Sequence, residues 1–548
     1  MLNDTLSKCQ NIVQLLYQRG CRNVSISPGL RNTAISLSFI NHKGFKCYSI
    51  IDERSAGFFA LGLTLKSKTP TILICTSGTA LANYFPSIIE SSQSRVPIII
   101  ITADRPKNLI NTGENQTINQ TNIYGDFVRN NYNINIKQDK NQILKQIDNS
   151  YFISIGEDYD NLEKSTPGPV HINIHLDDFT NSKLKENLNI NLDKKIQIKS
   201  SFKKMAIPNY KKYLIVIGRL NEEIDEKMIT KLSKHLKAPI FADSLSQIRF
   251  NNNHVLSLYD HYLNDETIVP DMIIRFGQKP VSKNLCIKLN QWKNKTILID
   301  EYGRFNDNCG TIVKGNYTDS IKHIIHNTKE NTNLNFYSYF QSMDKIACDN
   351  IDTLNQWSEL IIAKLCLLSL NNNENLFVGN SMPIRYMDMI NPKTIKKDIN
   401  IYSNRGASGI DGLIATSLGV AKSTKQNTLL LVGDVSFIHD QNSLLIAKHY
   451  NINITIVIIN NSGGGIFSLL PLSKSIKKSI FNQYWNTSPD LNLKNIAKLY
   501  EFNYSKVNSI KQLSNALNKY KKSIGVDIID AHVDIQENKK ILNQIKKG

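Results

Sequence analysis

Two stretches in the last third of the chain decide the fold. Residues 428–436 read TLLLVGDVS, and residues 454–464 read ITIVIINNSGG. In each stretch a run of large apolar residues, typical of a buried strand, ends in small and polar residues. Asp434 and Asn461 are 461 − 434 = 27 residues apart, which leaves room for a helix and the return strand of one βαβ unit. Both side chains are therefore predicted to lie at the same edge of a parallel sheet, where its strands end.

The residue types at this edge favour a bound cation and a diphosphate. Carboxylate and amide oxygens suit a hard divalent ion such as Mg²⁺, which keeps its remaining positions for phosphate and water. Gly433, Gly463 and Gly464 would let the backbone approach a diphosphate closely, and amides near a helix start would donate to it. The alternative is a plain strand-to-helix turn beside an Asn-rich loop, in a chain where Asn-Asn pairs are common.

The rest of the chain repeats the alternation of apolar strands and helices. The predicted strands are Val24–Ser27, Cys47–Ile51, Thr71–Thr76, Val96–Thr102, Tyr213–Gly218, Pro239–Ala242, Met272–Gly277, Thr296–Asp300, Leu376–Gly379, Ile401–Ser403, Thr428–Gly433, Ile454–Asn460 and Val526–His532. Polar stretches separate them into three blocks. We therefore predict an α/β protein with three doubly wound parallel-sheet domains at 1–182, 209–330 and 331–548, with a linker at 183–208.

Composition narrows the possible functions. A chain of 548 residues with 41% apolar and 21% charged residues is typical of a globular protein with several cores. No apolar run approaches the roughly 20 residues of a membrane span, and the amino terminus lacks a secretory pattern. The net charge, 66 − 47 = +19, comes from lysines spread along the chain, so no nucleic-acid partner is expected. Eight scattered cysteines without a CxxC pair indicate a reducing compartment.

Further motifs lie where predicted strands end in both outer domains. In the first domain they are Asp52-Glu53-Arg54, Thr76-Ser77-Gly78-Thr79-Ala80, Thr102-Ala103-Asp104-Arg105-Pro106 and Gly113-Glu114-Asn115-Gln116. In the last they are VGNSMPIR at 378–385, NRGASGIDG at 404–412 and NNSGGGIFSLLP at 460–471. With the Asp434 motif, these segments resemble the 2-succinyl-5-enolpyruvyl-6-hydroxy-3-cyclohexene-1-carboxylate synthase family of thiamine diphosphate-dependent enzymes. The likeness is thinner in the middle domain, where Arg275-Phe276-Gly277 matches best.

The resemblance implies a cofactor site. Asp434, Asn461 and the carbonyl of Gly463 would hold Mg²⁺ or Mn²⁺ and, through it, thiamine diphosphate. Glu53 would be the catalytic residue that shares a proton with the aminopyrimidine ring of the cofactor. Taken alone, a carboxylate at that position would be an ordinary helix-start residue. The remaining implied cofactor contacts are Ile410, Gly433, Ser436, Gly464 and Ile466.

The resemblance also implies the substrates. The family decarboxylates 2-oxoglutarate and adds the resulting succinic-semialdehyde carbanion to isochorismate in a 1,4-addition, a step of menaquinone and phylloquinone biosynthesis. Both substrates are dicarboxylates, and the arginine guanidinium is suited to bidentate carboxylate binding. For each arginine alone, a surface ion pair would be the ordinary interpretation. The implied substrate-binding residues are Arg31, Arg105, Asn115, Gln116, Ser381, Arg385, Arg405, Ile466, Phe467 and Leu470.

Two positions depart from the family pattern. Val435 stands where the metal motif usually has Gly, and Leu30 stands where the first loop usually has a second Ser. The second change removes a hydroxyl near a substrate carboxylate. We expect weaker substrate binding rather than lost activity, since Arg31 remains.

Other functions stay open. A thiamine enzyme with another acceptor, such as an acetolactate synthase or a simple 2-oxo acid decarboxylase, would need fewer arginines. A nicotinamide or flavin dehydrogenase is disfavoured because no GxGxxG opens the first helix of any domain. A catalytically silent scaffold is disfavoured by Glu53, Asp434 and Asn461.

The remaining expectations concern partners and location. The resemblance implies a homodimer or homotetramer, with the cofactor between the first domain of one chain and the third domain of another. No membrane partner is expected. The Asn-, Lys- and Ile-rich composition suits the cytoplasm of an A+T-rich bacterium or a plastid stroma.

Overall fold

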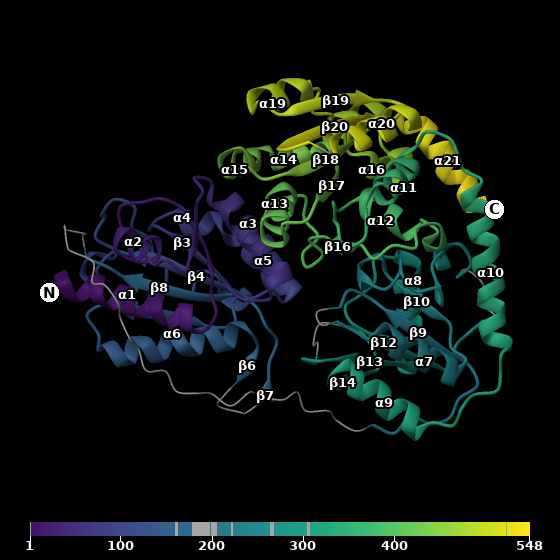
Figure 1. Ribbon diagram of the computed structural model, residues 1–548, viewed down its shortest axis with the longest axis horizontal. Coiled ribbons are helices and arrows are strands. Elements are labelled where there is room, and N and C mark those ends of the chain that lie inside the picture. Colours follow the sequence, from purple (N-terminus) through teal and green to yellow (C-terminus); the bar gives the residue numbers. More distant parts are fainter. Residues whose placement is uncertain are drawn as a thin grey trace. The chain divides into compact units, whose positions relative to one another are not determined.

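Three parallel β-sheets form the framework of the protein (Figure 1). The computed structural model describes residues 2–158, 163–177, 198, 205–220, 223–263, 268–303, 307–521 and 523–547. Each of the three sheets has six strands, and a two-stranded antiparallel ribbon joins β6 (Glu157–Asp158) to β7 (Glu163–Lys164). The predicted α/β class with three parallel sheets is confirmed. Most of the predicted linker, 183–208, lies outside the described residues, and the predicted domain boundaries stay a prediction.

The chain divides into two compact units. Unit 1 comprises Met1–Lys199, Asn404–Lys425 and His439–Ile452, and unit 2 comprises Ser200–Ser403, Gln426–Ile438 and Asn453–Gly548. In the described part of both units, no helix has the length and apolar character needed to cross a bilayer.

Unit 1 contains the first sheet, with strand order β2-β1-β3-β4-β8-β5 and every neighbouring pair parallel. Its strands are β1 (Asn23–Ile26), β2 (Lys46–Ser49), β3 (Thr71–Cys75), β4 (Ile98–Asp104), β5 (Asn131–Asn135) and β8 (Val170–His175). Its helices are α1 (Leu2–Gln18), α2 (Thr33–Ile40), α3 (Glu53–Ser67), α4 (Ala80–Asn83), α5 (Phe85–Ser94), η1 (Lys107–Leu109), η2 (Gly125–Phe127), α6 (Lys140–Ser154), α13 (Leu413–Thr424), η7 (Gln441–Ser443) and α15 (Leu444–Tyr450). Alternate strand residues face opposite sides, and those on one side form a core with α1, α2 and α6.

Helix α13 comes from late in the sequence and packs closely on α3 within unit 1 (Figure 1). A Cβ atom on Gly62 would lie 2.1 Å from the carbonyl oxygen of Thr416, and one on Gly419 would lie 2.3 Å from that of Phe59. Only glycine allows the backbones to come so near. The small residues of α3 and α13 therefore set how closely these two helices pack.

Unit 2 contains the second sheet, with strand order β11-β10-β9-β12-β13-β14, again all parallel. Its strands are β9 (Tyr213–Ile217), β10 (Ile240–Ala242), β11 (Val255–Leu256), β12 (Met272–Phe276), β13 (Thr296–Asp300) and β14 (Thr311–Lys314). The associated helices are α7 (Glu226–Leu236), η3 (Ser244–Ser246), η4 (Tyr259–His261), α8 (Lys283–Gln291), η5 (Lys293–Lys295), α9 (Tyr317–Asn327) and α10 (Asn335–Asp352). One side of the sheet forms a core with α7 and α9.

The third sheet, also in unit 2, has strand order β16-β15-β17-β18-β20-β19 and is all parallel. Its strands are β15 (Asn375–Val378), β16 (Asn400–Tyr402), β17 (Thr428–Gly433), β18 (Ile454–Asn460), β19 (Asn503–Val507) and β20 (Val526–His532). Its helices are α11 (Glu359–Ser369), α12 (Met382–Asp388), η6 (Pro392–Thr394), α14 (Asp434–His439), α16 (Gly465–Ser468), α17 (Leu472–Ser475), α18 (Lys478–Phe481), η8 (Asn482–Asn486), α19 (Leu493–Leu499), α20 (Ile510–Tyr520) and α21 (Ile535–Lys547).

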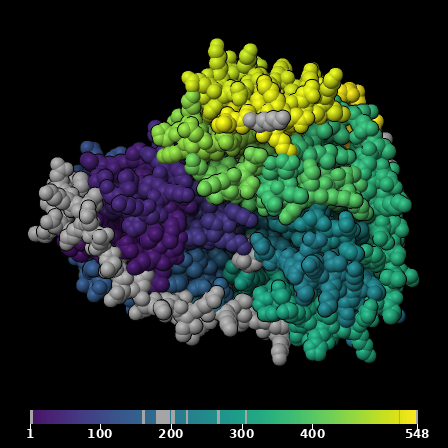
Figure 2. Space-filling model, viewed as in Figure 1, coloured from purple at the N-terminus to yellow at the C-terminus, as the bar shows by residue number. Residues whose placement is uncertain are grey.

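A single apolar core joins the second and third sheets inside unit 2. It includes residues of β9 and β12 together with α8, α10, α11, α12, α20 and α21. In the space-filling view, side chains close the spaces that the ribbons leave open (Figure 2). This core holds the third sheet rigidly, and the ends of its strands are therefore well placed to carry a site.

Candidate active site

The ends of β17 and β18 bring the metal motif together as the sequence predicted. The two strands are parallel neighbours, with Gly433 opposite Ile459 in the register. Asp434 begins α14 directly after β17, and Asn461 follows β18. The backbone N–H of Gly463 donates to Asp434 Oδ2 at 2.8 Å. Asp434 and the loop after β18 therefore form one local structure.

Asp434 is a buried carboxylate, with 4% of its surface exposed. Its Oδ1 accepts a hydrogen bond from the N–H of Val435 at 2.8 Å. This contact uses only the backbone of Val435, so it is kept although Val435 replaces the usual Gly. The pKa of Asp434 is raised to about 6, mainly by burial and to a smaller extent by the nearby carboxyl of Glu359, while the backbone N–H groups of Val435 and Gly463 lower it. A cation would offset this cost of burying the charge.

Asn461 has one side-chain atom that is satisfied and one that is not. Its Nδ2 donates to Glu359 Oε1 at 2.8 Å, whereas its Oδ1 is buried and has no hydrogen-bond partner among the described residues. A buried acceptor without a donor is costly, and a metal ion would satisfy it. The described residues hold no group of three or more His, Cys, Asp and Glu side chains arranged for a metal. A metal here would be bound by carboxylate, amide and carbonyl oxygens, which suits Mg²⁺ or Mn²⁺.

The glycines of the motif differ in their surroundings. A Cβ atom on Gly433 would meet nothing within 4 Å, so this position leaves space beside the strand end. Gly463 has φ 133°, and a Cβ there would lie 2.2 Å from the carbonyl oxygen of Asn486. The N–H of Gly464 donates to that same carbonyl at 2.6 Å. Gly463 and Gly464 are thus required by the packing of this loop against η8.

The other residues predicted on this edge lie on short helices. Ser436 is buried in α14, two residues after Asp434. Phe467 lies in α16 and Leu470 follows it, and both are exposed apolar side chains. Ile466 is half-buried. Neighbouring exposed apolar side chains are typical of surfaces that a ligand or partner covers.

The start of α12 contains the predicted pair Ser381 and Arg385. Ser381 has φ 70° and ψ −125°, a backbone conformation that is strained for any residue except glycine. The guanidinium of Arg385 donates to the carbonyl oxygen of Ser381. Strain of this kind is concentrated at functional sites, so the observation favours the predicted role of this turn.

In unit 1, Glu53 is the first residue of α3, and Asp52 caps that helix by accepting from the N–H of Ser55 at 3.3 Å. Glu53 is half-buried, and its Oε2 accepts from Asn83 Nδ2 at 3.4 Å. The predicted position at a helix start after a strand is confirmed. Its predicted part in catalysis stays a prediction.

The first-sheet arginines use part of their hydrogen-bonding capacity on their own unit. Arg31 is nearly buried and donates to the carbonyl oxygen of Leu176 at 3.2 Å. Leu30 beside it is 76% exposed. Arg105 donates to the carbonyl oxygen of Asn115 at 2.8 Å, which joins two of the predicted residues.

The turn at Gly78 lies against the loop that carries Gln116. A Cβ on Gly78 would lie 3.3 Å from Gln116 Cα, and Gln116 has φ 52°. The buried side chain of Gln120 ties the two together, because its Oε1 accepts from the N–H of Gly78 at 3.1 Å and its Nε2 donates to Asn173 at 2.7 Å. Sequence motifs that are far apart along the chain therefore form one loop cluster.

The NRGASGIDG segment is held by a residue that the sequence analysis missed. The buried carboxylate of Glu90 accepts from the N–H of Gly406 and of Ala407, both at 2.7 Å. Arg405 directly precedes these two residues, and Ile410 beyond them is partly exposed. Gly412 then begins α13 with φ 65°. Glu90 therefore fixes the backbone next to a predicted substrate arginine.

A sequence signal for Glu90 did exist, and it also applies to Glu359. Both are acidic residues within helices. Neither has Lys or Arg three or four residues away in the sequence, the spacing at which a helix pairs charges. A helical Asp or Glu that lacks a Lys or Arg at this spacing indicates that its hydrogen-bond donors come from a distant part of the sequence.

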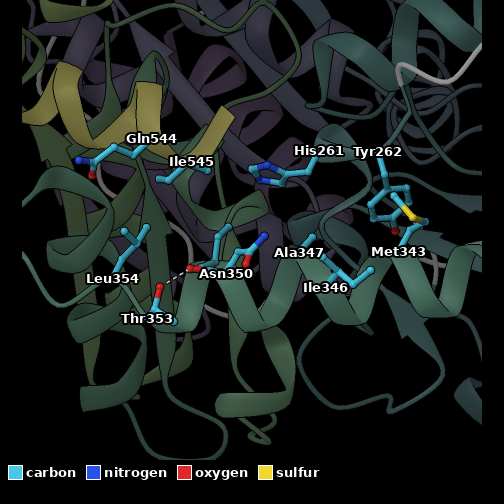
Figure 3. Close-up of a pocket in the computed structure, with 11 residues that line it drawn as sticks. His261, Tyr262, Met343, Ile346, Ala347, Asn350, Thr353, Leu354, Gln544 and Ile545 are labelled. Carbon is cyan, nitrogen blue, oxygen red and sulfur yellow. Dashed lines mark hydrogen bonds between the residues drawn. The ribbon is translucent and has the colours of Figure 1, made fainter. Parts of the chain in front are cut away.

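A cavity of about 250 Å³ in unit 2 lies apart from these motifs (Figure 3). It is lined by residues of η4, α10 and α21, among them His261, Tyr262 and Asn350, and by none of the predicted site residues. Burial lowers the pKa of His261, so this side chain is neutral at neutral pH. A largely apolar cavity without a cationic group is not suited to dicarboxylates.

Two family models match the chain. The thiamine pyrophosphate enzyme N-terminal binding domain matches residues 9–123, and the thiamine pyrophosphate enzyme C-terminal binding domain matches residues 387–531. The two matches contain the first-sheet and third-sheet motifs respectively.

Similar proteins extend over nearly the whole chain. A 2-succinyl-5-enolpyruvyl-6-hydroxy-3-cyclohexene-1-carboxylate synthase of Listeria welshimeri is 35% identical, covering 96% of this chain and 94% of that protein. The synthases of the same name from Oceanobacillus iheyensis and Staphylococcus haemolyticus are 35% and 34% identical, with 95% and 92% of those proteins covered.

A solved structure supports the fold alone. Benzoylformate decarboxylase from Polynucleobacter necessarius superposes with a TM-score of 0.71 at 13% identity, over 96% of this chain and 98% of that one. The relatives settle the family: this chain belongs to the 2-succinyl-5-enolpyruvyl-6-hydroxy-3-cyclohexene-1-carboxylate synthase family and is a thiamine diphosphate-dependent enzyme.

Proposed function

We propose that this enzyme decarboxylates 2-oxoglutarate and adds the remaining succinic-semialdehyde unit to isochorismate. The products are 2-succinyl-5-enolpyruvyl-6-hydroxy-3-cyclohexene-1-carboxylate, for which its relatives are named, and CO₂. Such a step belongs to menaquinone or phylloquinone biosynthesis. The observation that carries the proposal is the buried oxygen set at the third sheet, in which Asp434 and Asn461 lie beside one glycine loop.

Asp434, Asn461 and the carbonyl of Gly463 would hold Mg²⁺ or Mn²⁺. The unpartnered Oδ1 of Asn461 and the buried carboxylate of Asp434 support this assignment. Gly433 and Ser436 would face the diphosphate, since the first leaves space and the second lies in the first turn of α14. That turn also offers backbone N–H groups of the kind that bind phosphate.

Bound thiamine diphosphate would supply a nucleophilic carbon and an acceptor for the electron pair that decarboxylation of a 2-oxo acid releases. Glu53 would hold and move the proton at the aminopyrimidine ring, and Asn83 at 3.4 Å keeps its carboxylate oriented. Arg31, Arg105, Arg385 and Arg405 would bind substrate carboxylates, with Ser381, Asn115 and Gln116 adding hydrogen bonds. Ile410, Ile466, Phe467 and Leu470 would exclude water from the reacting groups.

We also propose that the chain works as a homodimer or homotetramer, with its cofactor shared between the first domain of one chain and the third of another. The exposed apolar side chains Phe467 and Leu470 support a surface covered in the working enzyme. Its proposed location is the cytoplasm of a bacterium or a plastid stroma, and the eight free thiols are consistent with a reducing compartment.

The proposal is tested by incubating the enzyme with thiamine diphosphate, Mg²⁺, 2-oxoglutarate and isochorismate, and measuring the product mass. We expect product only when both substrates are present. Pyruvate replaces 2-oxoglutarate in the control reaction. Turnover of pyruvate without isochorismate, at the rate of the proposed substrates or faster, would instead assign the enzyme to a decarboxylase or acetolactate synthase activity.

A further inference from the structure

Glu359 is a buried carboxylate directly behind the candidate metal site. It is the first residue of α11 and only 2% exposed. No cation forms an ion pair with it in the described part of the chain. Capping of α11 does not explain it, because Ser358 already accepts from the N–H of Ile361 at 3.4 Å. Burying a carboxylate without a cation costs free energy. Its presence here is therefore explained by a role other than helix capping or ion pairing.

The hydrogen bonds of Glu359 connect it to the site. Its Oε1 accepts from Asn461 Nδ2 at 2.8 Å, and its Oε2 accepts from the hydroxyl of Tyr386 at 2.8 Å. Asn538 completes the network by accepting from the N–H of Glu359 at 3.0 Å and donating to the oxygen of Tyr386 at 3.2 Å. Both carboxylate oxygens are therefore fixed by side chains from other elements.

An Asn side chain can present either its oxygen or its nitrogen to a given neighbour. Because a carboxylate only accepts hydrogen bonds, Glu359 determines that the NH₂ group of Asn461 faces it. The oxygen of Asn461 must then point the other way, and this is the buried oxygen without a partner. An alanine or leucine at 359 would remove this control and leave the amide able to rotate.

We propose that Glu359 is a positioning residue that holds the Asn461 oxygen toward a divalent cation. This inference rests on the metal site proposed above. Groups of this kind orient metal ligands in many proteins, and their loss typically weakens metal binding by about 10- to 100-fold. Glu359 acts on Asn461 through this hydrogen bond and on Asp434 through its charge. Glu359→Gln removes the charge and keeps an oxygen that can accept from Asn461, so comparing the Gln and Leu variants isolates the positioning role from the charge.

The chain provides a matched control. Glu374 is also a buried carboxylate of unit 2, and its Oε1 accepts from the side-chain amide of Asn427 at 2.8 Å. Glu374 directly precedes β15 and Asn427 directly precedes β17, so this pair lies where the strands begin, whereas Asp434 lies where β17 ends. Glu374→Leu therefore makes the same chemical change to the same kind of pair, away from the candidate metal site.

The test measures Mn²⁺ affinity by electron paramagnetic resonance, with thiamine diphosphate present and without substrates. We expect Glu359→Leu to bind Mn²⁺ about 10- to 100-fold more weakly than the wild type. Glu359→Gln should stay within a few-fold of the wild type, because its oxygen can still accept from Asn461. Glu374→Leu should leave the affinity unchanged.

A double-mutant cycle separates positioning from general stability. In an Asn461→Ala background, the loss of Mn²⁺ affinity between Glu359→Gln and Glu359→Leu should shrink to less than about twofold, because both variants lack the charge and only the hydrogen bond to Asn461 distinguishes them. An equal loss in both backgrounds, or wild-type affinity in Glu359→Leu, would overturn the proposal. Tyr386→Phe is the milder variant if Glu359→Leu does not fold: it frees one oxygen of Glu359, and its smaller loss must also vanish with Asn461→Ala.

The failure of this inference can be told from failure of the metal site itself. If Asp434→Ala leaves Mn²⁺ affinity unchanged, the proposed metal site is wrong. If Asp434→Ala weakens binding but Glu359→Leu and Tyr386→Phe do not, the metal site stands and Glu359 only stabilises the fold.

Discussion

The ends of the first-sheet and third-sheet strands carry the two halves of the proposed site, and they differ in how far they are assembled. At the third sheet, Asp434 accepts from the N–H of Gly463, and Asn461 in the same loop is held by Glu359. At the first sheet, Arg31 and Arg105 donate to backbone carbonyls of their own unit. The metal motif is therefore held by contacts at its own strand ends, whereas the guanidinium groups of Arg31 and Arg105 are partly used on backbone carbonyls.

The largest effect is expected from Asp434→Ala at the assembled end. Losing a charged ligand leaves metal and diphosphate under-coordinated, which costs several kcal/mol, or on the order of 10³-fold in affinity. Calorimetric titration with thiamine diphosphate and Mg²⁺ measures this directly. Asp434→Asn is the size-matched control and should be nearly as weak, because it lacks the charge. Unchanged cofactor affinity in the alanine variant would remove Asp434 from the site.

Glu53→Gln tests the catalytic residue at the first sheet. The glutamine has nearly the same shape, so cofactor binding should be kept. Proton transfer at the aminopyrimidine ring should fall by roughly 10²- to 10⁴-fold, as is typical of a lost general acid–base group. The measurement is exchange of the thiazolium C2 proton by NMR. Exchange at the wild-type rate would leave Glu53 as a helix-start residue only.

Arg405→Lys and Arg385→Lys test the two predicted substrate arginines that follow third-sheet strands, β16 and β15. Both changes keep the net charge at +19, so a diffuse attraction of anions is nearly unaltered. Lysine cannot reproduce bidentate carboxylate binding, and we expect a loss of about 1.5–3 kcal/mol in kcat/KM. Cofactor affinity should scarcely change. Steady-state kinetics with each substrate varied would contradict the substrate assignment if both variants kept wild-type kcat/KM.

The smallest effect is expected at Asp440, a structural carboxylate outside both strand-end sites. It is fully buried and accepts from the N–H of Ala415 at 3.0 Å and the hydroxyl of Ser443 at 2.8 Å. Burial raises the pKa of Asp440 to about 6, whereas an unfolded Asp titrates near 3.9. The folded state therefore keeps the carboxyl proton of Asp440 up to a higher pH than the unfolded state does. The stability gained from this protonation is lost as the pH rises from about 4 to about 6.

The Asp440→Asn variant measures that contribution. The thermal unfolding midpoint of the wild type should fall more between about pH 4 and about pH 7 than that of the variant, by the equivalent of at most about 3 kcal/mol. Identical pH dependence in the two proteins would show that Asp440 keeps the same pKa when unfolded.

The part of the fold that was predictable is the part built from apolar strands. The predicted bounds of β13, β17, β18 and β20 agree with the structure. Strand β8 was missed, although the alternation of His171, Asn173 and His175 with apolar residues is itself typical of a strand with one polar face. In the structure these polar side chains are buried. His171 and Asn173 both pair with the hydroxyl of Thr102 at 2.8 Å, a contact between residues distant in sequence.

The candidate site was predictable to a similar extent. Asp434 and Asn461 could be placed together because strand order follows from one βαβ unit. Glu90 and Glu359 could not, since their partners lie 316 and 102 residues away in the sequence. A motif identifies residues that contact a ligand, whereas residues that hold those in place depend on tertiary packing and carry only the weak signal of an acid without a local cation.

The central claim is that one enzyme breaks the bond to the carboxyl carbon of 2-oxoglutarate and joins the rest to isochorismate. The most direct measurement supplies uniformly ¹³C-labelled 2-oxoglutarate with unlabelled isochorismate, thiamine diphosphate and Mg²⁺, and follows the label by mass spectrometry. We predict labelled CO₂ and a product that carries every labelled carbon except the one lost. Labelled CO₂ with free succinic semialdehyde, and no label joined to isochorismate, would contradict the account.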